Sequence, residues 1–195
     1  MTREQFDHLV KLNPYYRGRW GYYSAAIEIL RREGFDQRGS DVLEIGPAAV
    51  PLVAGSQVMQ FHKASPHVRT ESPTYVWDAA QTPWPIGTGR YDAAAALQVW
   101  EHLRGKQREA FAELRRVARF AVLSFPYKWR GGGDAKHAVT DETIAGWTLG
   151  HAMKDRVVVP DDESPKVLRV VCSFEFGGGP TAGPRKRAES SGKTL

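Results

Sequence analysis

The sequence has little cysteine and no long hydrophobic run. Its 195 residues include a single cysteine, Cys172, so no disulfide can form within the chain. Cys172 ends the mostly apolar run 167–172, which favours a buried strand residue over a reactive thiol. No run approaches the roughly 20 apolar residues of a membrane-spanning helix, and residues 1–11 mix charged and apolar positions, unlike a signal peptide. These absences predict a cytoplasmic protein that does not enter the membrane.

Motifs for metal ions and for phosphate loops are also missing. The six histidines and the cysteine are scattered, and none forms a His-x₃-His or Cys-x₂-Cys pattern. Gly192-Lys193-Thr194 matches the end of a phosphate loop, but no strand or helix is expected around it, so the match is accidental. The sequence therefore predicts no metal site.

The part of the chain that is expected to fold has little net charge of either sign. The formal net charge is +5, and residues 177–195 carry three of these charges in a segment rich in glycine, proline and serine. This composition predicts a disordered tail. The basic cluster 185–187 could touch phosphates, but a solvated tail is favoured. With the rest of the chain nearly neutral, nucleic acid is not the expected partner.

The length fits one domain in which helices alternate with short strands. Residues 4–33 predict a helix that breaks at Asn13-Pro14 and ends at Gly34, and a later helix begins at the N-cap Thr140. Phe111, Leu114 and Val117 mark the buried face of a helix that runs to about residue 119. Seven strands are predicted, at 41–45, 58–61, 75–77, 91–99, 120–125 (stopped by Pro126), 157–159 and 167–176.

The connections after the first two predicted strands look too short for full crossover helices. Residues 46–55 contain two prolines, and the next apolar run begins almost at once. Residues 62–74 also contain two prolines and little apolar periodicity. Both crossover helices are therefore expected to be shortened.

Polar residues follow three of the predicted strands, at the positions where parallel α/β sheets bind ligands. The segments are Asp41-Val42-Leu43-Glu44-Ile45-Gly46-Pro47, Tyr75-Val76-Trp77-Asp78 and Leu97-Gln98-Val99-Trp100-Glu101-His102-Leu103. In this order they resemble class I S-adenosylmethionine-dependent methyltransferases, over roughly residues 38–130. The resemblance implies a Rossmann-like three-layer α/β sandwich with about seven mostly parallel strands, the last of them antiparallel. It also implies S-adenosylmethionine as the cofactor.

Three parts of the chain follow from this resemblance and from composition. Residues 1–37 are expected to form a helical lid or cap, 38–176 the cofactor-binding α/β domain, and 177–195 the disordered tail. The segment 14–23 is dense in aromatic residues and arginine. Arg17 or Arg19 is a candidate partner for the cofactor carboxylate, with Tyr23 beside it. The alternative is a helix that packs on the sheet through its tyrosines and leaves its arginines in water.

The resemblance implies a set of cofactor-binding residues at the strand ends. Gly46 is expected to allow a close backbone approach, and Glu44 to organise the loop and the amino group. Asp78 matches the acceptor for the adenine amino group, against the alternative that it only closes its own turn. The remaining candidates are Pro47, Ala48, Gln60, Ala79, Gln98 and Val99.

Two departures from the family pattern weaken the cofactor assignment. Pro47, Ala48 and Ala49 stand where the family has further glycines, and the proline removes an amide donor. At the end of the second strand, Gln60 or His62 replaces the acid that binds the ribose hydroxyls. The chain would then hold the cofactor less strongly, or not at all.

His102 is the candidate general base, because it starts a helix at the mouth of the expected site. Glu101 is expected to orient it or to act as the base itself, and a helix cap is the alternative for the pair. His137, Asp134 and Tyr127 are further candidates facing the acceptor. Together these residues predict methyl transfer to an oxygen or nitrogen of a small molecule, apolar or planar because aromatic residues line the site. The rival functions are a non-enzymatic binding or scaffold protein and a nucleic-acid or protein methyltransferase.

Overall fold

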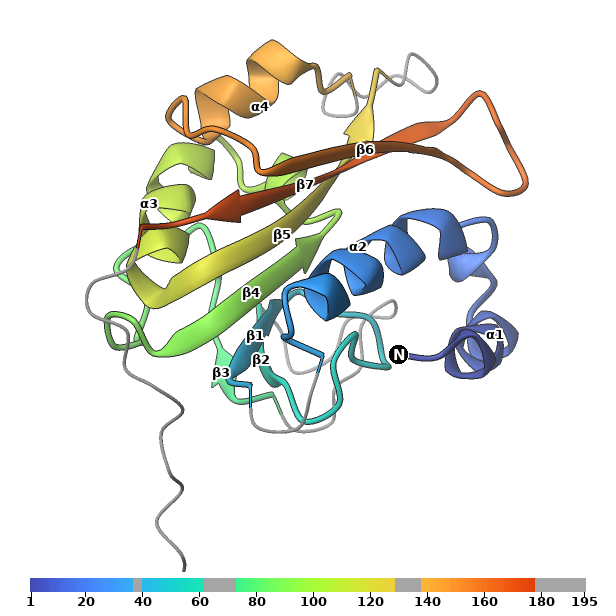
Figure 1. Cartoon of the computed structure of the whole chain (residues 1–195), viewed down its shortest axis with the longest axis horizontal. Coiled ribbons are helices and arrows are strands. Elements are labelled where there is room, and N and C mark those ends of the chain that lie inside the picture. Colours follow the sequence, from blue (N-terminus) through green and yellow to red (C-terminus); the bar gives the residue numbers. More distant parts are fainter. Residues whose placement is uncertain (37–39, 62–72, 129–137, 178–195) are drawn as a thin grey trace, which may run out of the picture.

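The computed structural model describes residues 1–36, 40–61, 73–128 and 138–177, and its centre is one seven-stranded sheet (Figure 1). The strand order is β3-β2-β1-β4-β5-β7-β6. β7 runs antiparallel to β5 and β6, and every other neighbouring pair is parallel. The strands are β1 (Val42–Ile45), β2 (Gln57–Gln60), β3 (Tyr75–Val76), β4 (Tyr91–Leu97), β5 (Ala118–Tyr127), β6 (Asp155–Pro160) and β7 (Leu168–Glu175).

Helices cover both faces of the sheet. α1 and α2 lie on one face, where α2 contributes Tyr22, Ala26 and Leu30 to the core. α3 and α4 pack on the other face. The helical elements are α1 (Arg3–Leu12), η1 (Pro14–Tyr16), α2 (Trp20–Arg32), η2 (Trp100–His102), α3 (Gln107–Val117) and α4 (Asp141–Trp147). The result is the predicted three-layer α/β sandwich.

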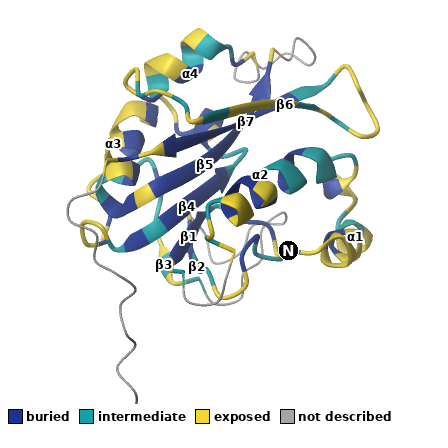
Figure 2. Cartoon of the chain, in the orientation of Figure 1, coloured by how far each residue is buried: buried dark blue, intermediate teal, exposed yellow. Residues whose placement is uncertain are grey.

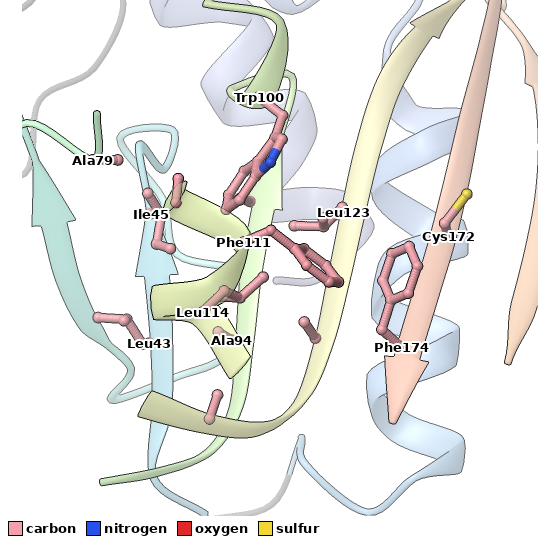
Figure 3. Packing of buried hydrophobic residues seen from close by; sticks show 14 of the residues in the cluster. Leu43, Ile45, Ala79, Ala94, Trp100, Phe111, Leu114, Leu123, Cys172 and Phe174 are labelled. Carbon is pink, nitrogen blue, oxygen red and sulfur yellow. The ribbon is translucent and has the colours of Figure 1, made fainter. Parts of the chain in front are cut away.

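Apolar side chains on alternating strand positions explain the two cores. Figure 3 shows the α3 side, where Phe111 and Leu114 of α3 share one core with Leu123 of β5 and Phe174 of β7. All four are completely buried, and the central strands are buried along most of their length (Figure 2). Cys172 belongs to the same core, as its sequence context predicts. Burial of these two faces fixes which side chains reach the ends of the strands.

Local signals in the sequence set the helix ends. Thr2 and Gln5 form a reciprocal capping box at the start of α1. The chain breaks at Asn13, whose side chain caps η1. Gly34 follows α2 with φ +81°, and its amide donates to the Arg31 carbonyl, so it ends the helix as predicted. Thr140 caps α4 by accepting from the Thr143 amide.

Two predicted strand ends are wrong by two residues. β4 ends at Leu97 rather than at 99, because Gln98 takes φ +56°. β5 continues through Pro126 to Tyr127. β4 pairs with β5 only as far as Ser124, whose carbonyl points toward β4. Pro126 lies two residues later and so faces the same side of β5. β4 has already ended there, so no β4 carbonyl needs the N–H that proline lacks. The proline therefore costs no ladder hydrogen bond.

The remaining differences are small or lie outside the described residues. α3 ends at Val117, two residues before the predicted end. The connection from β1 to β2 holds no helix, in line with the expected shortening. The expectations for His62, for the loop with Asp134 and His137, and for the tail from 178 fall on residues that the structure does not describe. In the described part of the chain no helix is both long and apolar enough to cross a membrane.

Candidate functional site

The predicted site residues gather at one edge of the sheet. β1, β2, β3, β4 and β5 are mutually parallel, so their carboxyl ends lie at the same edge. α2 begins near this edge and then runs back across the sheet (Figure 1). Ligands of open α/β sheets bind at such an edge. The site is therefore built from the residues that directly follow these strands.

The turn after β1 depends on Gly46. Its backbone has φ +60°, and its amide donates to the Met59 carbonyl of β2 at 2.9 Å. A Cβ atom at this position would lie 2.9 Å from Cγ2 of Val99. Any other residue would thus meet both backbone strain and a steric clash. The turn brings Gly46 and Val99, two predicted cofactor residues, into contact.

Glu44 holds the loop that follows Gly46. The Leu52 and Val53 amides each donate to its carboxylate at 3.0 Å, and the Ser56 hydroxyl donates at 2.6 Å. The side chain is buried, and burial raises the pKa of Glu44 despite these hydrogen bonds. Both carboxylate oxygens are occupied by the loop. Glu44 therefore organises residues 46–56, the first of its two expected roles.

A small cavity lies beside this turn. Its walls include Tyr23 of α2, Glu44, Gly46, Pro47 and Ala48, five predicted cofactor residues. The cavity volume is about 10 Å³, the space of roughly one water molecule. An adenosyl group is much larger than this space, so the loop or the side chains that line the cavity would have to move before one could bind here. The backbone turn suits a close approach of a ligand, and the side chains restrict the room.

Asp78 and Ala79 follow β3 in a tight turn. One carboxylate oxygen of Asp78 accepts from the Ala80 amide at 2.9 Å, and the Ala79 carbonyl accepts from the indole N–H of Trp84 at 3.0 Å. The second Asp78 oxygen accepts no hydrogen bond from the described residues. Gln60 is buried at the end of β2. Asp78 thus closes its own turn and keeps one oxygen for a ligand.

Gln98 is held in an unusual conformation at the end of β4. Its φ is +56°, and both its backbone amide and its side-chain amide donate to the Ser124 hydroxyl oxygen, at 3.1 and 3.2 Å. Strained residues of this kind are concentrated at functional sites. The side-chain carbonyl of Gln98 is left to accept from a ligand. The sequence shows no signal for Ser124, which lies inside an apolar strand.

The aromatic segment that leads into α2 packs on the sheet through the first turn of that helix. Tyr22 and Tyr23 are buried, and Arg19 stacks 3.9 Å from the centre of the Tyr15 ring. Arg169 of β7 lies over Tyr22 and pairs with Asp161 at 3.0 Å. This buried pair was missed by sequence reasoning because an arginine within an apolar run gives no sign of its partner. Arg19 and Arg169 both act electrostatically on Glu101.

Glu101 and His102 lie just beyond β4. Nε2 of His102 is 3.9 Å from a carboxylate oxygen of Glu101, whose side chain is 2% exposed against 58% for His102. The second Glu101 oxygen is buried and has no hydrogen-bond partner among the described residues. Burial raises the pKa of Glu101 to about 8. Near pH 7 Glu101 is therefore mostly neutral, and His102 is the exposed group of the pair.

A larger cavity of about 500 Å³ opens beside this pair, between the residues that follow β4 and helix α4. Its volume is typical of pockets for small ligands. The structure thus brings Glu101 and His102 to a cavity. His137 lies outside the described residues. No group of three potential metal ligands comes together within the part of the chain that the structure describes.

The raised pKa of Glu101 predicts a pH dependence of stability. The folded protein binds a proton more tightly than the unfolded chain, so the free energy of unfolding should fall as pH rises from about 4.5 to about 8. Glu101→Gln should remove roughly 4 kcal/mol of this fall, since each unit of the pKa rise is worth about 1.4 kcal/mol. Urea unfolding at several pH values measures it, with Glu28→Gln on the exposed face of α2 as the control. Equal pH slopes for Glu101→Gln and the parent protein would contradict the assignment.

Comparison with known proteins finds likeness in structure only. No family model and no curated protein matches the sequence. A Haloferax volcanii protein described provisionally as a methyltransferase, in complex with the activator Trm112, superposes with a TM-score of 0.61 at 9% identity, covering 92% of this chain and 99% of that one. The Burkholderia thailandensis 1,6-didemethyltoxoflavin-N1-methyltransferase, with its substrate and S-adenosylhomocysteine bound, gives 0.58 at 12% identity, covering 91% and 92%.

A third similar structure is the N-methyltransferase NodS of Bradyrhizobium japonicum with S-adenosylhomocysteine. It gives a TM-score of 0.53 at 17% identity, covering 80% of this chain and 87% of that one. In this chain the superposed fold is built on the mostly parallel seven-stranded sheet with its one antiparallel strand. This chain has the fold of the class I S-adenosylmethionine-dependent methyltransferases.

Proposed function

We propose that the protein transfers a methyl group from S-adenosylmethionine to an oxygen or nitrogen of a small-molecule acceptor in the cytoplasm. The observation that carries the proposal is the Gly46 turn, which has positive φ, is followed by a loop held by Glu44, and lies at the ligand-binding edge of this fold. The solved structures with bound S-adenosylhomocysteine support the choice of cofactor.

Several residues of this edge would hold the cofactor. Gly46 gives access to the backbone, the second oxygen of Asp78 would accept from the adenine amino group, and Gln60 ends β2, where the resemblance places the ribose. The cavity beside Gly46 must widen to admit the adenosyl group. When bound, the cofactor supplies an electrophilic methyl group, and holding the acceptor in line with it gives much of the rate.

The protein's own groups can take up the proton that the acceptor loses. His102 is exposed at the cavity, and its neutral ring accepts a proton near pH 7. Glu101 is mostly protonated at that pH because burial raises its pKa to about 8, so little of it is in the form that can accept a proton. Its nearer oxygen lies 3.9 Å from Nε2 of His102, beyond hydrogen-bond distance. We therefore assign His102 as the base, with Glu101 as its buried neighbour.

Asp78→Ala tests the adenine contact. We expect the affinity for S-adenosylhomocysteine to fall by roughly 1.5–3 kcal/mol, the range of a hydrogen bond to a charged group. The turn also loses its bond to the Ala80 amide, so Asp78→Asn, which keeps an oxygen for that amide, is the matched variant. Calorimetric titration measures both. An affinity change below a few tenths of a kcal/mol in Asp78→Ala would leave Asp78 as a turn residue only.

A non-enzymatic binding or scaffold protein is the second candidate. It is favoured by the cavity at Gly46, which has room for about one water, and by the missing acid at the end of β2. A nucleic-acid or protein methyltransferase is less favoured, because residues 1–176 are nearly neutral.

The enzymatic proposal is tested by measuring the conversion of S-adenosylmethionine to S-adenosylhomocysteine. A panel of phenols, amines and aromatic acids is supplied as candidate acceptors. Acceptor-dependent release is the expected result. Cofactor binding without release for any acceptor would favour the scaffold.

A further inference from the structure

The larger cavity has a wall composition that points to a class of ligand. It is formed by the connection between β4 and α3 on one side and by α4 on the other. Its residues were not predicted as a set, because they come from two segments more than 30 positions apart in the sequence. The lining includes Glu101, His102, Arg104, Gln107, Val139 and Trp147.

One part of the wall is flat and apolar. Trp147 is half-buried, and its ring packs 6.0 Å from the ring of Phe125, which belongs to the core. Val139 is buried beside the same cavity. A tryptophan fixed by the core presents a rigid face, and such faces favour aromatic rings. The ligand that suits this wall is planar.

The charged part of the wall is cationic at neutral pH. Arg104 is exposed at the cavity and carries a full positive charge, and His102 adds a second basic group. The one acid in the described lining is Glu101, which is mostly neutral near pH 7 because burial raises its pKa to about 8. Arg104 also has φ +51°, a strained conformation for a residue other than glycine. The ligand that suits this wall carries a negative charge.

We propose that this cavity binds the acceptor and that the acceptor is a planar aromatic acid, with its ring against Trp147 and its carboxylate toward Arg104. That the bound acid is the methyl acceptor rests on the proposed function, whereas the binding site itself rests on the cavity alone. Gln107 and Thr143 offer further polar groups in the same wall. The reaction would then modify a ring nitrogen, a hydroxyl or the carboxylate of such an acid.

Binding can be tested without the cofactor. Ligand-observed NMR titrations with benzoate, 4-hydroxybenzoate, indole-3-carboxylate and quinoline-2-carboxylate are compared with titrations of the matching uncharged amides. We expect at least one acid to bind saturably. Arg104→Gln should weaken it by about threefold to tenfold and leave its amide within about twofold, since only the acid pairs with the guanidinium.

Trp147 gives the second arm of the test. Trp147→Leu should weaken the acid and its amide alike, by about tenfold, and Trp147→Phe, which keeps a planar ring, should restore most of the affinity. Arg108→Gln is the matched control, because Arg108 lies exposed on α3 outside the cavity lining. Thermal unfolding of each variant shows that the fold is kept.

The outcomes separate the two proposals. Suppose that S-adenosylhomocysteine binds but no acid does, or that acid binding is unchanged in Arg104→Gln and Trp147→Leu. Either result overturns the cavity assignment and leaves the proposed function standing. Acid binding that depends on Arg104 and Trp147, in a protein that does not bind S-adenosylhomocysteine, supports the cavity as a site for aromatic acids and contradicts methyl transfer.

Discussion

Gly46→Val should abolish binding of S-adenosylhomocysteine, a loss of more than about 100-fold in affinity. Gly46 has φ +60°, which a β-branched residue rarely adopts, and its Cβ would lie 2.9 Å from Val99 Cγ2. The new side chain would fill the point where the cofactor must approach the backbone. Calorimetric titration measures the affinity, and circular dichroism shows whether the sheet remains intact.

Two further variants separate blocked binding from backbone strain. Gly34→Ala introduces a side chain at φ +81° with no atom within 4 Å of the new Cβ, so it reports the strain alone and should keep affinity. Val99→Ala removes the side chain next to Gly46 without adding backbone strain, so it should also keep affinity. Unchanged binding in Gly46→Val would contradict the assignment of the site.

His102→Gln should lower turnover by about 10²-fold to 10⁴-fold, the usual cost of removing a general base. Its side chain is 58% exposed, so the melting temperature should change little. Steady-state kinetics with any acceptor that gives turnover measures the effect. His8→Gln, on the exposed part of α1, is the control. Turnover within about threefold of the parent protein would leave positioning of the acceptor as the mechanism.

The fold follows closely from patterns in the sequence. Alternating apolar runs and the break at Asn13-Pro14 gave the strands and helices, and the acids and glycines after the runs marked the ligand edge. The wrong boundaries had tertiary causes. No local pattern shows that β4 stops pairing with β5 at Ser124, so that Pro126 can stay in β5 without losing a hydrogen bond. Nor does any local pattern show that Gln98 takes positive φ and donates to the Ser124 hydroxyl.

Site residues could be predicted where their role depends on their place at the end of a strand. They could not be predicted where it depends on a partner from another segment of the chain. Glu44 lies on β1 and Gly46 directly follows it, and both were identified from that apolar run. Arg169 and Asp161 meet within the β6–β7 hairpin, whereas Trp147 and Arg104 line one cavity only after α4 docks on the sheet. The raised pKa of Glu101 depends on the burial of its side chain in the folded protein, which no sequence pattern specifies.

Calorimetric titration of the full chain with S-adenosylmethionine tests the central claim most directly. Saturable binding of one equivalent that Gly46→Val abolishes and Gly34→Ala preserves is the predicted result. No binding by a folded protein, or equal binding by Gly46→Val and the parent chain, would contradict the account.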